Sequence, residues 1–277
     1  MNVTDPKLSR RRFVGGVAWA ASAVALHENF GNFLYAAKKR VINQTYPWGP
    51  LRPTQDETTG LFLIQLPEGF RYRTFGWKSE VMSTGGATPG AHDGMAAIHT
   101  DGNIVTLVRN HELDTKGPSF APAESTYDPG SGGGCTILKF DTDKGELVHS
   151  APSIGGTVRN CAGGPTPWGT WLTCEETVVG PGEKSSHEKP HGYVFEVSHD
   201  GTANTTPIKD MGRFVHEAVA VDPKTHRIYL TEDRDKAGLY RYTPRKRDSI
   251  ADGGQLQMLR IAGKNDVRRG VSVGTDS

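Results

Sequence analysis

The stretch from Met95 to Glu112 reads Met-Ala-Ala-Ile-His-Thr-Asp-Gly-Asn-Ile-Val-Thr-Leu-Val-Arg-Asn-His-Glu. Two runs rich in apolar and β-branched residues flank an Asp-Gly-Asn turn, a pattern that predicts a β-hairpin. The second run ends in a carboxylate. The same plan recurs in residues 161–176 and 218–233. A unit that recurs in this way indicates a repeat architecture.

Each copy is followed by another hairpin-like stretch, so one repeat holds about four strands, which is the blade of a β-propeller. The closing carboxylates Glu112, Glu175 and Glu232 are separated by roughly 60 residues, which implies long loops between blades. Closing a propeller takes about four to eight blades, and only three can be counted here. We therefore expect an all-β fold, an incomplete β-propeller of about three four-stranded blades. The second hairpin-like stretches begin at Cys135, Tyr193 and Leu239.

In a propeller, the inner strand of every blade lines the central channel. We expect the strands that precede the closing carboxylates to be these inner strands, at residues 104–109, 170–173 and 227–231. The three closing glutamates would then lie near one another at the channel. One strand-end glutamate alone is ordinarily a solvated charge, but three in register favour a shared site.

The charges of the chain are balanced, with 32 Lys and Arg residues against 31 Asp and Glu residues and a formal net charge of +1. This balance gives no basis for binding a polyanion, so we expect no nucleic acid partner. Hydrophobic residues make up 35% of the chain, which is enough to form a sizeable core.

The first 40 residues differ from the rest. The run Ser9-Arg-Arg-Arg-Phe-Val14 precedes a weakly apolar stretch that extends to Leu26. This order is typical of a twin-arginine export signal. The apolar stretch is shorter than the roughly 20 residues that span a bilayer, so we expect no stable membrane span. Residues 1–40 are predicted as the leader, with the twin-arginine export machinery as partner and a periplasmic or extracellular location. The propeller domain is predicted for residues 41–277.

Three cysteines lie in this exported chain, so at least one is unpaired. Cys135 and Cys174 lie in apolar, strand-like runs and are expected to be buried small side chains. Cys161, next to Asn160 and a run of small residues, is the candidate ligand. A thiolate suits a transition metal such as iron, whereas the many strand-end carboxylates suit calcium. The chain has no Gly-x-Ser-x-Gly nucleophile elbow and no phosphate-binding P-loop.

The most distinctive segment is long and unusual: Asn160-Cys-Ala-Gly-Gly-Pro-Thr-Pro-Trp-Gly-Thr170. Other characteristic runs are His92–Met95, Val108–Glu112, Thr173–Glu176, Gly192–Glu196, Gly212–Ala218 and Tyr229–Arg234. Together these segments, which cover about residues 60 to 245, resemble the PhoX family of alkaline phosphatases.

The resemblance implies a propeller enzyme that hydrolyses small phosphate monoesters with an iron pair (Fe³⁺) and several calcium ions. It implies that Cys161 is the iron-bound thiolate and makes Glu217 the candidate for an iron-binding glutamate. The remaining candidate metal ligands are Glu112, Glu175, Glu176, Glu232, Asp233 and Asp93. The resemblance also suggests a monomer.

Three further residues are candidates for catalysis. His111 and His216 would orient ligands or carry protons, or else are hydrogen-bonded strand-end histidines. Arg234 would contact phosphate in a bidentate manner, or else form a salt bridge with a neighbouring acid. The family also has an Arg-x-Glu-Gly segment nearer the carboxyl terminus, and this chain has none. We therefore expect a truncated chain that lacks part of the site.

Two other functions stay open. A calcium-dependent propeller lactonase or esterase would use similar carboxylates without a cysteine ligand. The other alternative is a non-catalytic, truncated propeller.

The leader generates the first test. Replacing Arg10 and Arg11 by Lys should block export, because the twin-arginine machinery reads the arginine pair. The measurement is the amount of protein in the periplasm and medium of producing cells. Unchanged secretion of the double variant would refute the assignment.

Overall fold

The computed structural model describes residues 48–114, 117–182, 185–247 and 249–263. The predicted leader, residues 1–40, lies outside these ranges. The chain divides into two units, residues 1–75 and residues 76–277. Within the described ranges, no helix has the length and apolar character needed to cross a membrane.

The described part of the first unit is a small antiparallel hairpin of β1 (Arg52–Gln55) and β2 (Phe62–Leu66). Asp56 organises the turn between them, because its carboxylate accepts hydrogen bonds from the backbone N–H groups of Thr58 and Thr59. An aspartate that caps its own turn in this way stabilises a tight connection.

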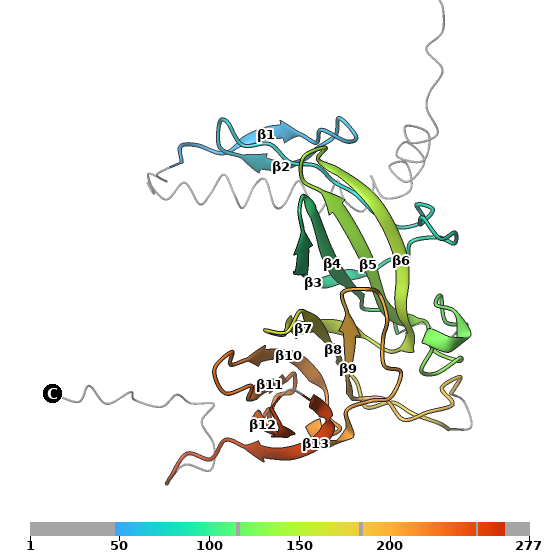
Figure 1. Cartoon of the computed structure of the whole chain (residues 1–277), viewed down its shortest axis with the longest axis vertical. Helices are drawn as coiled ribbons and strands as arrows, with labels where there is room; N and C mark the ends of the chain where they lie inside the picture. Colours follow the sequence, from blue (N-terminus) through green and yellow to red (C-terminus); the bar gives the residue numbers. More distant parts are fainter. Residues whose placement is uncertain (1–47, 115–116, 183–184, 248, 264–277) are drawn as a thin grey trace, which may run out of the picture. The chain divides into compact units, whose positions relative to one another are not determined.

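The second unit consists of three antiparallel sheets, each made of strands consecutive in the sequence (Figure 1). We call these sheets blades 1, 2 and 3. Blade 1 comprises β3 (His92–Asp101), β4 (Ile104–His111), β5 (Gly133–Asp141) and β6 (Glu146–Thr157). Blade 2 comprises β7 (Asn160–Pro165), β8 (Thr170–Glu175) and β9 (Val194–Ser198). Blade 3 comprises β10 (His216–Val221), β11 (Ile228–Glu232), β12 (Leu239–Lys246) and β13 (Ser249–Met258).

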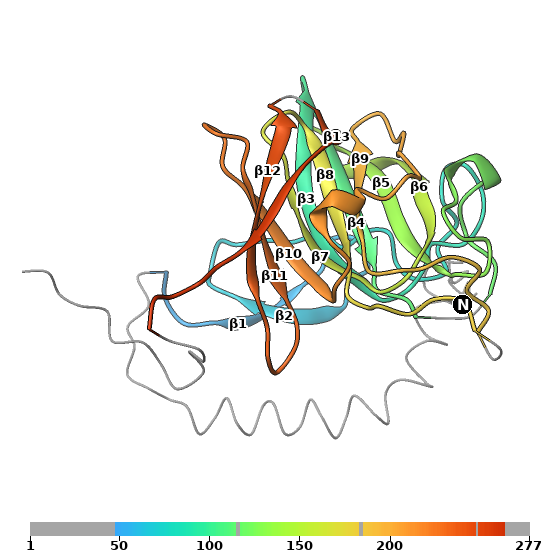
Figure 2. The same ribbon diagram turned by 90° about the horizontal axis from the view of Figure 1, so that it is seen from below.

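The inner strands of the blades are β3, β7 and β10, because β7 packs against both of the others. Figure 2 shows β7 and β10 side by side. The expectation that residues 104–109, 170–173 and 227–231 are inner strands is therefore wrong. They are equivalent to one another, but they form β4, β8 and β11, which are the second strands of their blades. The predicted repeats do begin in β3, β7 and β10, and this first strand of each repeat is the inner one.

Two hydrophobic cores fill the spaces between blades, and strand β8 contributes to both. Trp171 packs with Val108 and Ile154 of blade 1. Leu172 and its neighbours pack with residues of blade 3. Successive side chains of a strand point to opposite faces, so one short strand seals two interfaces. Cys135 and Cys174 are fully buried, one in each core.

The all-β expectation is confirmed. The described residues contain no α-helix, only two short 3₁₀ turns at Ala123–Ser125 and Lys209–Met211. The second hairpins predicted from Cys135, Tyr193 and Leu239 contain β5, β9 and β12. Blade 2 departs from the expected four strands, because only three are formed among the described residues.

The contact between blades 2 and 3 generates a stability test. A Cβ atom on Gly164 of β7 would overlap the carbonyl oxygen of Val219 on β10. Gly164→Ala should therefore lower the free energy of unfolding by about 1–3 kcal/mol, as overpacking does elsewhere. Gly182→Ala is the control, since the added Cβ meets nothing closer than 4.0 Å. Urea unfolding of the wild type and both variants measures this. If Gly164→Ala were as stable as the wild type, the contact between β7 and β10 would not be as tight as the structure indicates.

Candidate metal centre

Each inner strand loses its pairing register at the same place. The first cross-strand pairs are His92 with His111, Asn160 with Glu175, and His216 with Glu232. The register shifts immediately after each of these pairs, as at a β-bulge. Bulges redirect side chains and are frequent beside active sites. The residues that directly follow the three pairs on the inner strands are Asp93, Cys161 and Glu217.

These three side chains meet carboxylates that directly follow the second strand of each blade. The ligand atoms of Asp93, Glu112 and Cys161 lie within 4.8 Å of one another. The same is true of Cys161, Glu176 and Glu217. Cys161 belongs to both groups, and the side chain of Asp233 hydrogen-bonds to that of Glu176. We call these six residues the channel cluster, and every blade contributes two of them.

One backbone hydrogen bond recurs in all three blades and positions the second carboxylate. The N–H groups donate from Glu112 to Ala91 O (2.8 Å), from Glu176 to Arg159 O (2.9 Å) and from Asp233 to Val215 O (3.1 Å). Ala91 and Arg159 have φ angles of 47° and 51°. This left-handed region is uncommon for residues with a side chain. Such backbone conformations concentrate at functional sites.

Arg159 is the cation that the structure places against the cluster. Its Nη2 lies 2.7 Å from Glu176 Oε2 and 3.2 Å from Glu112 Oε1. Arg159 is not among the site residues predicted from the sequence. Its position directly before Asn160 and Cys161 was the available signal.

Among the described residues, the cluster brings one thiol and five carboxyl groups together beside the guanidinium of Arg159. The Cys161 thiol donates to Glu217 Oε1 over 3.4 Å. Burial, this hydrogen bond and the charge of Asp93 raise the pKa of Cys161 far above its ordinary value. Burial and hydrogen bonds with Asp233 and Glu112 raise the pKa of Glu176 to about 7. A bound cation reverses both effects, since it favours thiolate and carboxylate.

Two predicted ligands point elsewhere. Glu175 is fully buried and accepts hydrogen bonds from backbone N–H groups of Val158, Gly192 and Tyr193. Glu232 accepts hydrogen bonds from the backbone of Gly238 and the hydroxyl of Tyr240. The expectation that Glu112, Glu175 and Glu232 are equivalent and share the channel is therefore wrong. The cause is strand alternation, which makes the residue after each strand, and not its last residue, the one that joins the cluster.

The predicted catalytic residues also lie outside the cluster. Both ring nitrogens of His111 are in hydrogen bonds, with Gly90 O and Thr136 Oγ1, and burial lowers its pKa to about 3. His216 is fully buried against the ring of Phe214, and burial lowers its pKa to about 4. These are properties of structural histidines. Arg234 is exposed, directly after Asp233.

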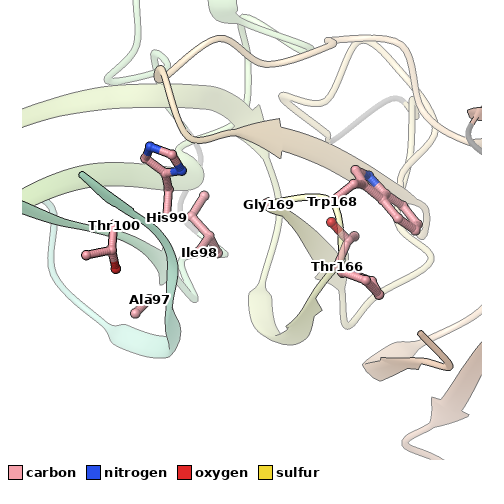
Figure 3. Close-up of a pocket in the computed structure, with 8 residues that line it drawn as sticks. Ala97, Ile98, His99, Thr100, Thr166, Trp168 and Gly169 are labelled. Atoms are coloured by element: carbon pink, nitrogen blue, oxygen red, sulfur yellow. The ribbon is translucent and has the colours of Figure 1, made fainter. Parts of the chain in front are cut away.

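A hollow of about 550 Å³ is lined by none of the cluster residues. Figure 3 shows its lining, which comes from residues 97–100 of β3 and residues 166–169 at the turn between β7 and β8. His99 is the one titratable residue among these, and its ring stacks on His199. The channel cluster lies at the opposite ends of β3 and β7.

The raised pKa of Glu176 generates a pH test on protein freed of metal by a chelator. The folded state keeps this proton to about pH 7, whereas the unfolded chain releases it near the ordinary value of 4.5. The contribution to stability is fully present below the unfolded pKa and is lost as the pH rises through the folded pKa.

Glu176→Gln should therefore flatten the decline in unfolding free energy between about pH 5 and pH 8. Glu146→Gln, at an exposed position on β6, is the matched control and should keep the wild-type slope. Chemical unfolding at several pH values measures both. Identical slopes in all three proteins would contradict the account.

Comparison with known proteins identifies the family. The family model described as alkaline phosphatase PhoX matches residues 47–153 and 144–274. No curated protein matches the chain. Among solved structures, the chain is similar to Pseudomonas fluorescens PhoX in complex with vanadate, a transition state analogue, with 19% identity and a TM-score of 0.45. That match covers 62% of this chain and 46% of the other, so the chain matches about half the length of that structure. Because the family model extends over all three blades and the channel cluster, this chain belongs to the PhoX family of alkaline phosphatases.

Proposed function

We propose that the channel cluster binds metal ions and hydrolyses phosphate monoesters. The observation that carries this proposal is the convergence of one thiol and five carboxylates, two residues from each blade, on a single place. Membership of the family supports the same reaction. Iron and calcium are the proposed ions, and a small phosphate ester is the proposed substrate.

The residues of the cluster fit these ions. Carboxylate oxygens are the ligands that calcium prefers, and a thiolate favours a transition metal such as iron. Arg159 supplies one positive charge beside the five carboxyl groups of the cluster. Bound cations would balance the remaining negative charge. Cys161 and Glu217 would hold iron, while Asp93, Glu112, Glu176 and Asp233 would complete the ligands for iron and calcium.

Bound metal ions would supply Lewis acidity and make a water molecule nucleophilic near neutral pH. The chain's own residues would perform the remaining tasks. The bulges in β3, β7 and β10 keep Asp93, Cys161 and Glu217 in place, so the ligands need little rearrangement when ions bind. Arg159 holds Glu112 and Glu176 through its guanidinium. Arg234, exposed beside the cluster residue Asp233, is proposed to contact the phosphate.

Cys161 distinguishes this proposal from a calcium-dependent lactonase or esterase. A site that binds only calcium does not need a thiolate, because the ligands of calcium are oxygen atoms. Cys161 belongs to both close groups of ligand atoms in the cluster. We further propose that the leader exports the protein through the twin-arginine pathway to the periplasm or the medium.

Cysteine substitutions test the function. We expect the full-length, metal-loaded enzyme to show visible absorption from thiolate bound to ferric iron and to hydrolyse p-nitrophenyl phosphate. Cys161→Ala should bleach the colour, lower the iron content and remove most of the activity, because the metals provide both the nucleophile and the charge neutralisation.

Cys174→Ala is the control, since Cys174 is fully buried in the core between blades 2 and 3. It should keep iron, colour and activity and lose on the order of 1 kcal/mol of stability. Full activity and iron content in Cys161→Ala would refute the iron site. Loss of both in Cys174→Ala alone would show that the wrong cysteine was chosen.

A further inference from the structure

A second group of potential metal ligands lies outside the channel cluster, where two loops meet. Ligand atoms of Asp128, His187 and His191 lie within 4.8 Å of one another. Asp128 belongs to the connection between β4 and β5, and the histidines belong to the connection between β8 and β9. Asp128 and His191 are fully buried. None of these residues has a part in the proposed phosphatase chemistry.

The ring of His191 is oriented as in a metal-bound histidine. Its Nδ1 lies 2.6 Å from Oε1 of the buried Glu175. Histidine ligands of metals commonly donate their other ring N–H to such a carboxylate, which fixes the tautomer. Nε2 lies 3.0 Å from Asp128 Oδ2 and 3.2 Å from Ser131 Oγ, so an ion bound here would replace the proton that Nε2 shares with Asp128. His187 Nδ1 reaches the same hydroxyl at 2.7 Å.

Two buried carboxylates lie on either side of the His191 ring. Asp128 and Glu175 are both carboxylates with fully buried side chains, and the His191 ring lies between them. The amine of Lys189 donates to Tyr127 O and thus to a neutral carbonyl. Burial lowers the pKa of His191, but its hydrogen bonds with Glu175 and Asp128 outweigh this and raise it. In the metal-free chain a proton on this ring therefore compensates the two acids, and a divalent cation bound at Nε2 would take the place of that proton.

The loop that carries both histidines contains a sequence pattern known from zinc proteins. Residues 187–191 read His-Glu-Lys-Pro-His, which matches His-Glu-x-x-His, the motif that binds zinc on a helix of metalloproteases. Here residues 185–191 form neither helix nor strand, and Glu188 is exposed. The arrangement of a protease is therefore not formed. The two rings still converge, with centroids 5.2 Å apart.

We propose that Asp128, His187 and His191 bind one zinc-type divalent ion as a structural site that ties the two loops together. Two imidazoles and a carboxylate are typical zinc ligands. Glu175 orients the His191 ring through its hydrogen bond with Nδ1. The buried hydroxyl of Ser131 lies close enough to be the fourth ligand. Burial gives the ion a structural role, since catalytic zinc keeps an open position. The loops are pressed together here, because a Cβ on Gly130 would overlap Ser186 O.

The test uses the full chain after removal of metals with a strong chelator, followed by addition of Zn²⁺, or of Co²⁺ as a coloured probe. The variant is His187→Gln, whose amide can still hydrogen-bond to Ser131 but is a poor zinc ligand. His187→Cys restores a zinc ligand. His149→Ala, a histidine on β6 outside the group, is the matched control. Repeating the titration in Cys161→Ala separates this site from the channel cluster.

Wild type, His149→Ala and Cys161→Ala should each take up one tightly bound equivalent at this site. Their melting temperatures should rise by roughly 5 °C or more at a free zinc concentration about 100-fold above Kd. His187→Gln should lose that equivalent and most of the shift, and His187→Cys should regain both. Equal uptake and equal shifts in wild type and His187→Gln would overturn the proposal, as would a wild-type melting temperature that does not respond to zinc. Loss of phosphatase activity alone would bear only on the channel cluster.

Discussion

The buried amide of Asn110 joins blade 1 to the bulge that carries Cys161, and the arrangement of the channel cluster depends on it. Its Nδ2 donates to the carbonyl oxygens of Cys161 and Ala162, at 2.8 and 2.7 Å. Its Oδ1 accepts from Trp171 and Thr173 of the adjacent strand β8. A fully buried amide must satisfy its hydrogen bonds or incur a large desolvation cost. The inner strand of blade 2 is therefore held in one position relative to blade 1.

The cost of the site is electrostatic. Acids from three blades are brought together against Arg159, and the pKa of Glu176 rises to about 7 as a consequence. Functional sites commonly concentrate charge that weakens the fold, and the rest of the structure compensates for it. Here the compensation comes from the two apolar cores between blades, to which strand β8 contributes on both faces.

Adjacent residues have opposite roles at the strand ends. Glu175 faces the interior, accepts three backbone N–H groups and holds His191. Glu176, its neighbour, faces Cys161 and Glu217. The same division separates His111 from Glu112. One residue of each pair thus supports the blade, and the other is available to bind a ligand.

The sequence by itself determined the repeat and the all-β class, because turn residues and alternating apolar runs are local signals that survive without any knowledge of packing. The family followed from the resemblance of particular segments, above all residues 160–170. The sequence also singled out Cys161 and the acids around it. It did not determine which acid of Glu175 and Glu176 joins Cys161 and Glu217, since strand alternation makes a one-residue error reverse the outcome. The roles of Arg159 and Asn110, and the meeting of Asp128 with His191, were decided by the tertiary structure alone. The hydrogen bonds of Asn110 with Cys161 and of Asp128 with His191 join residues 51 and 63 positions apart in the chain, and only the packing of the blades brings such residues together.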